Sequence, residues 1–126
     1  MNFTEQELVA MTHLGLLMAA ANGEIVELEK NVIQREITAI GINLGINTED
    51  RVKSLFDKVR RIQPTEAIAT LLSMQKDKQK YILNYLETVM RADGSIDEDE
   101  KELMQYLSDI IAQEEIKQFL KYLGSL

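Results

Sequence analysis

Apolar residues recur along this chain at the spacing of helices. A capping box at Thr4–Glu7 predicts the start of a first helix, because Thr and Glu three residues apart satisfy free backbone N–H groups. Its apolar face is predicted to consist of Leu8, Met11, Leu14 and Met18. A second helix is predicted to end near Gly41 and to carry Val32, Ile33, Ile37 and Ile40.

The same pattern predicts five further helices after a loop at Gly41–Asn47. Thr48 is predicted to cap a third helix that runs to Ile62, and Pro64 to begin a short fourth. The fifth has the most regular stripe, formed by Ile82, Tyr85, Leu86, Val89 and Met90. A sixth spans the apolar residues from Leu103 to Ile111, and a seventh those from Ile116 to Leu123, ending at Gly124. The sequence therefore predicts an all-α fold of about seven helices in an irregular bundle.

One turn occurs twice in the sequence. Residues Ala21–Lys30 and Ala92–Lys101 both read Ala-Asn/Asp-Gly-x-Ile-x-Glu-x-Glu-Lys, at an offset of 93 − 22 = 71 positions. Each copy is preceded and followed by a predicted helix. We therefore interpret residues 1–126 as a single domain of two pseudo-repeats, about 5–61 and 65–123, that cover each other's apolar faces.

Composition and charge narrow the classes of function. The 126 residues include no cysteine, and the net charge of −7 disfavours nucleic-acid binding, which needs a cationic surface. No apolar run reaches the roughly 20 residues that span a bilayer, and the first residues lack the basic start of a signal peptide. We expect a cytoplasmic protein that is not an integral membrane protein.

The charge is unevenly distributed. Residues 51–80 hold eight Lys and Arg against three acids, a local charge of +5. The eight are Arg51, Lys53, Lys58, Arg60, Arg61, Lys76, Lys78 and Lys80. A solvated helix face is the ordinary meaning of such a run, and a docking surface for an anionic membrane or an acidic partner is the alternative.

The acidic second turn has two interpretations. In the structural one, Gly94 provides a positive φ, Asp97 caps the next helix and Glu100 completes a capping box. In the functional one, six acids within residues 93–102 supply oxygen ligands for Ca²⁺ or another divalent cation. An EF-hand is not expected, because its first and third ligand positions would fall on Val89 and Arg91.

The duplicated turn, with Ala-Asp-Gly-x-Ile at its second copy, resembles the TerB-like family, the tellurite-resistance protein B domain. The resemblance covers roughly residues 5–123 and implies a seven-helix bundle with internal duplication. It also implies a divalent-cation site, which falls on Asp93, Asp97 and Glu100, with Asn22 and Glu29 as their equivalents in the first copy. The family commonly has an acid where this chain has Asn22.

Enzymatic chemistry is not indicated. His13 is the only histidine, stands on an apolar helix and has no visible partner, so we interpret it as structural. No catalytic triad and no phosphate-binding loop can be recognised. The resemblance instead implies a non-catalytic stress-response module with a protein partner, peripheral to the inner face of a membrane. The alternative is a helical interaction scaffold that binds no metal and docks on a membrane-associated or acidic partner.

Overall fold

The computed structural model describes residues 2–21, 23, 25–46 and 48–125. Over these residues the chain forms six α-helices and one 3-10 helix, and no strand, so the predicted all-α class is confirmed. The elements are α1 (Glu5–Ala20), α2 (Glu27–Gly41), η1 (Ile42–Leu44), α3 (Glu49–Arg61), α4 (Pro64–Ser73), α5 (Lys76–Arg91) and α6 (Glu98–Gly124). None of these helices combines the length and apolarity that a bilayer crossing demands.

The helix starts follow the local chemistry that the sequence indicates. Thr4 and Glu7 form the expected capping box, with N···O distances of 2.8 and 3.1 Å. Thr48 accepts a hydrogen bond from the backbone N–H of Arg51, 3.3 Å away. Pro64 is the first residue of α4, where its missing N–H leaves no helical bond unmade. The predicted loop at Gly41–Asn47 contains the short helix η1, and Asn47 itself lies outside the described residues.

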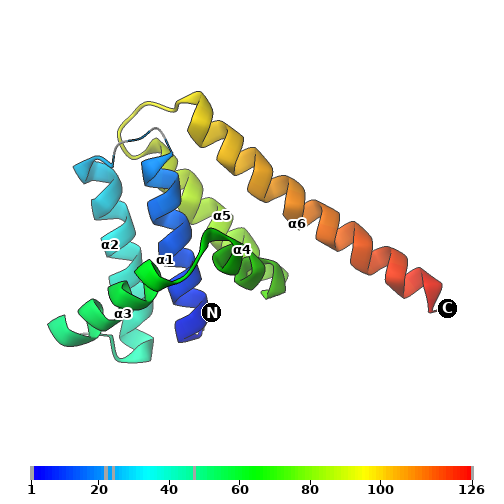
Figure 1. Cartoon of the computed structure of the whole chain (residues 1–126), viewed down its shortest axis with the longest axis horizontal. Coiled ribbons are helices and arrows are strands. Elements are labelled where there is room, and N and C mark those ends of the chain that lie inside the picture. The colour runs from blue at the N-terminus through cyan, green and yellow to red at the C-terminus, as the bar shows by residue number, and fades with distance from the viewer. Residues whose placement is uncertain (1, 22, 24, 47, 126) are drawn as a thin grey trace.

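Helix α1 forms the centre of the bundle. It packs against α2, α3, α4 and α5, which lie around it in Figure 1. Its predicted face is buried, but so are Val9, Ala10 and Thr12 on its other sides. The Thr12 hydroxyl donates to the Leu8 carbonyl, 2.8 Å away, so this buried polar group is satisfied within the helix. The core is therefore arranged around one helix and not between two equal layers.

Helix α6 corrects the prediction of a separate seventh helix. The predicted sixth and seventh helices are one continuous helix of 27 residues, so the described residues contain six α-helices. The four residues between the two apolar runs, Ala112 to Glu115, include no proline or glycine and favour helix, which removes the expected break.

The continuity of α6 places its two apolar runs on opposite sides. Ile116 follows Leu107 by nine residues, and Leu120 follows Ile111 by nine, which is about two and a half turns. Leu107 and Ile111 are buried against the body, whereas Ile116 and Leu120 are exposed.

Candidate functional site

The two acidic turns lie at the same end of the helical body, one between α1 and α2 and the other between α5 and α6 (Figure 1). Each contains a glycine with left-handed backbone, Gly23 at φ 88° and Gly94 at φ 81°. No heavy atom lies within 4 Å of the place where a Cβ would stand on either glycine. The glycines are thus required by backbone conformation and not by space.

A buried glutamate occupies the third helical position after each turn. Glu29 in α2 is 0% exposed and Glu100 in α6 is 1% exposed. Their neighbours Glu27 and Glu98 stand two positions earlier and remain at or near the surface. Burial of an ionised carboxylate is unfavourable unless a cation or several hydrogen-bond donors compensate it. Their burial therefore sets these two glutamates apart from the other acids of the turns.

Hydrogen bonds satisfy these carboxylates only in part. The Val26 backbone N–H donates to Glu29 Oε1, 3.1 Å away, whereas Glu29 Oε2 is buried without a partner among the described residues. Glu100 Oε2 is likewise buried and without a partner there. Each turn thus presents one carboxylate oxygen that is shielded from water and unpaired within residues 2–21, 23, 25–46 and 48–125.

Asp97 caps α6 as predicted. Its Oδ1 accepts a hydrogen bond from the Glu100 backbone N–H, 2.9 Å away. The reciprocal bond of a capping box, from the Asp97 N–H to the Glu100 carboxylate, is not among the hydrogen bonds of the described residues, so the predicted box is not completed. The equally buried Glu29 does accept the equivalent bond from the Val26 N–H, so the two turns differ in this respect.

Charged groups of both turns act on the two buried glutamates. Burial, together with the negative charges of Asp97, Glu29 and Asp93, raises the pKa of Glu100 to about 7. Burial also raises the pKa of Glu29, with Asp93 and Asp97 adding repulsion. Acids of both turns therefore disfavour the ionised forms of Glu29 and Glu100.

The predicted ligands are only partly brought together. Asp93 and Asp97 are half-buried, and Asp93 Oδ1 already accepts a hydrogen bond from the Ser95 N–H, 3.0 Å away, as a local turn requires. Within the described ranges, no three histidine, aspartate or glutamate side chains are arranged as they stand to hold a metal ion. Asn22, the fifth predicted ligand, lies outside the described residues.

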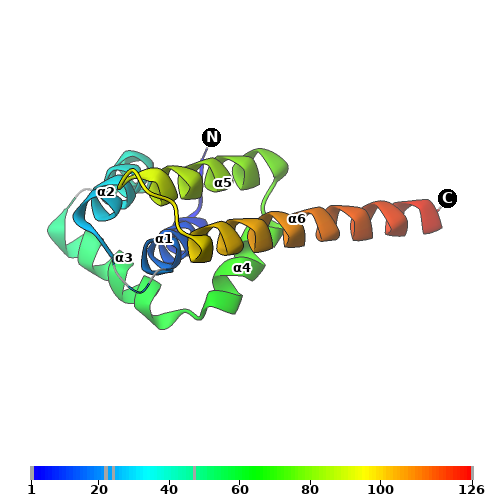
Figure 2. The same ribbon diagram turned by 90° about the horizontal axis from the view of Figure 1, so that it is seen from above.

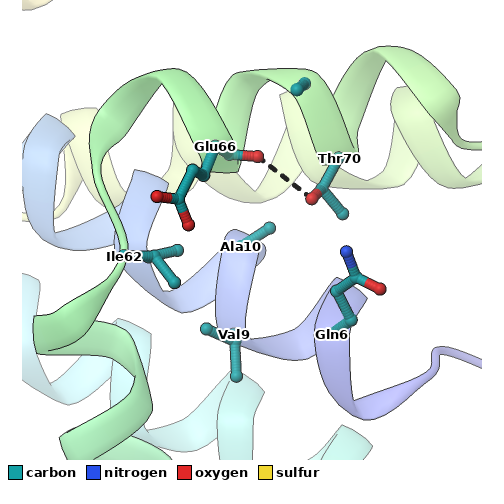
Figure 3. A pocket seen from close by; sticks show the side chains of 7 residues that line it. Gln6, Val9, Ala10, Ile62, Glu66 and Thr70 are labelled. Carbon is teal, nitrogen blue, oxygen red and sulfur yellow. Dashed lines mark hydrogen bonds between the residues drawn. The ribbon is translucent and has the colours of Figure 1, made fainter.

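A separate cavity of about 290 Å³ lies between α1 and α4 (Figure 3). It is lined by Gln6, Val9, Ala10, Ile62, Glu66, Ala69 and Thr70. The Thr70 hydroxyl donates to the Glu66 backbone carbonyl, 3.0 Å away, so it is engaged by its own helix. This hydrogen bond joins Thr70 to the backbone of Glu66 and not to its carboxylate.

His13 connects α1 to α3. Its Nδ1 lies 3.0 Å from the Val59 carbonyl oxygen, and since a carbonyl only accepts, Nδ1 carries the proton. Its Nε2 is buried and has no hydrogen-bond partner among the described residues. This contact favours the structural interpretation of the only histidine.

The basic residues of 51–80 are partly neutralised by acids. The ion pairs are Lys53–Glu49, Lys58–Glu5, Arg60–Asp57 and Lys78–Glu7. Two of these acids, Glu5 and Glu7, come from the first turn of α1 and so reduce the local excess of positive charge. The pairs on α3 are exposed, where an ion pair contributes little to stability. This arrangement favours a solvated face for α3.

Comparisons with known proteins show a likeness among solved structures. No model of a protein family matches the chain, and no curated protein matches it. Among solved structures, the chain is similar to a crystallised protein of unknown function from Porphyromonas gingivalis, with a TM-score of 0.72 and 30% sequence identity. The likeness covers 89% of this chain and 81% of the other.

Proposed function

We propose that this chain, which belongs to the same family as the Porphyromonas gingivalis protein of unknown function, is a non-catalytic module that binds a divalent cation at its acidic turns. One observation carries the proposal: Glu29 and Glu100 are fully buried, and each has a carboxylate oxygen without a hydrogen-bond partner in the part of the chain that the structure describes. This role corresponds to the one that the TerB-like resemblance implies, in a stress-response setting at the inner face of a membrane.

The chemistry of the donors fits a hard cation. Ca²⁺ and Mg²⁺ prefer carboxylate oxygens, and a positive charge between Glu29 and Glu100 would offset the repulsion that raises their pKa values. Asp93 and Asp97 stand at the rim and are available to add ligands. Because these side chains are not yet arranged around a common point, binding requires their carboxylates to turn toward one another.

The two copies of the turn contribute equivalent residues to the proposed site. Glu29 and Glu100 occupy matching positions of the two turns, and Gly23 and Gly94 share the left-handed backbone. We infer that the two helix–turn–helix units arose by duplication and that each contributes one buried glutamate. Asn22 would supply a neutral oxygen where the second copy has Asp93.

Calcium and magnesium titrations of the full chain test the proposal. We expect heat in calorimetry and NMR shifts at Glu29, Asp93, Asp97 and Glu100. Glu100→Gln should abolish both signals, whereas Glu102→Gln, an exposed change of equal charge on the same helix, should preserve them. No heat and no shift with either cation would remove the cation-binding function.

A scaffold that binds no metal is the second candidate. It is favoured by the hydrogen bonds that already engage Asp93 and Asp97 in local backbone structure, and by the exposed basic residues of α3 as a surface for a membrane-associated or acidic partner. Under this function Asp97→Ala loses about 1 kcal/mol of stability through the cap alone. Calcium would then change the stability of the Asp97→Ala variant no more and no less than that of the wild-type chain.

A further inference from the structure

The second half of α6 extends beyond the helical body. Ile111 is the last buried residue that the structure describes, and of residues 112–125 only Glu114 is half-buried while the rest are exposed. Both views show this segment leading away from the other helices, with the C-terminus at its far end (Figures 1 and 2). We refer to residues 112–125 as the projecting segment.

The projecting segment carries an apolar stripe. Ile116, Phe119, Leu120 and Leu123 follow the spacing of one helix face, and we call them the α6 stripe. Their exposed fractions are 59%, 59%, 60% and 45%. These four side chains expose a patch on the order of 500 Å².

Such a patch on an isolated helix is unfavourable in water. The largest apolar patches on soluble monomers are of this size and are often functional. The projecting segment gains no burial beyond Ile111, so only its continuity with the packed half of α6 supports its helix. A covering surface would remove the α6 stripe from water and add the packing that this segment lacks.

We infer that the covering surface is the α6 stripe of a second copy of this chain. The projecting segment has two acids, Glu114 and Glu115, and two bases, Lys117 and Lys121, so two copies do not repel each other there. The same balance leaves this segment without the cluster of Lys and Arg that attracts an anionic membrane. Two patches of this size bury about 1,000 Å² in total before their polar flanks are counted, which approaches the area of a specific interface.

A two-fold pair also fits the shape of the surface. In a two-fold dimer both subunits use the same surface patch, so one apolar stripe per chain is sufficient to form the interface. The stripe lies opposite Leu107 and Ile111, which hold α6 on its own body, so pairing leaves those contacts intact. The inference is independent of cation binding, since it uses no residue of the acidic turns.

Sedimentation of the full chain over a range of concentrations tests the inference. We expect a reversible dimer that Leu120→Glu weakens by about thirtyfold or more, as loss of a central apolar contact does. Gln118→Glu is the matched control, because it adds the same charge on the opposite side of α6 and should keep the dimer. A monomer at every concentration, or a dimer that Leu120→Glu leaves unchanged, overturns the inference.

Two further measurements distinguish a second copy of the chain from a membrane as the surface that covers the α6 stripe. The chain has no cysteine, so Leu120→Cys should form an intermolecular disulfide under mild oxidation, while Gln118→Cys should not. Equal cross-linking at both positions contradicts pairing through the stripe. Flotation with phosphatidylcholine–phosphatidylglycerol vesicles should leave the protein unbound. Flotation that Leu120→Glu abolishes would make a membrane the occupant and overturn the dimer.

Discussion

Replacing Glu100 by glutamine should make this protein more stable at neutral and alkaline pH. In the folded state the pKa of Glu100 is raised from 4.5 to about 7, first by burial and then by Asp97, Glu29 and Asp93. A raised carboxyl pKa means that folding favours the protonated form. The stability that this proton provides is complete below about pH 4.5 and is lost as the pH rises through about 7.

The size of the effect follows from the two pKa values. At 1.36 kcal/mol per pH unit, the interval from 4.5 to about 7 corresponds to about 3 kcal/mol. Glutamine has nearly the same shape and no charge, so it avoids this penalty at high pH. Its amide adds a buried NH₂ group, which costs about 1 kcal/mol where it finds no acceptor. We therefore expect Glu100→Gln to raise the free energy of unfolding by about 2 kcal/mol at about pH 8.

Urea unfolding followed by circular dichroism between about pH 5 and 8, without divalent cations, measures this difference. The wild-type chain should lose stability as the pH rises, and Glu100→Gln should lose much less. Glu102→Gln, exposed on the same helix, should follow the wild-type curve. If wild type and Glu100→Gln show the same pH dependence, the buried carboxylate is not under the repulsion described above. Calcium should flatten the wild-type curve if it occupies the acidic turns.

Three other changes test the packing and the turns by the same unfolding assay. Gly15→Ala should lose about 2 kcal/mol, because its Cβ would stand 2.0 Å from the Tyr85 hydroxyl; Tyr85→Phe should restore part of that loss, and no rescue would contradict the contact. Gly94→Ala should lose about 1–2 kcal/mol through its φ of 81° alone, and a neutral result would argue against this turn geometry. Burial raises the pKa of Glu7, but its hydrogen bond and ion pair with Lys78 outweigh this and lower it. Lys78→Ala should therefore lose about 2 kcal/mol at pH 7 and show a smaller further loss on acidification, since the lowered pKa stabilises only above about pH 4.5.

The local features of the fold could be predicted from the sequence. Thr4, Thr48, Pro64 and Asp97 begin their helices as expected, because capping and proline effects depend on residues within one turn. The left-handed conformation of Gly94 is similarly local. The acids of the two turns could be singled out from their spacing, and Glu29 and Glu100 were among them.

Only the tertiary structure decided which of those acids are buried and which apolar faces are covered. Glu29 and Glu98 are both acids at a helix start, yet one is buried and the other exposed, because burial depends on what the neighbouring helices place above each side chain. The all-round burial of α1 likewise results from four helices that surround it. For α6, spacing correctly identified two apolar runs and wrongly separated them. Residues with high helix propensity join the runs into one rigid helix, and that rigidity carries the second run away from the core it was expected to join.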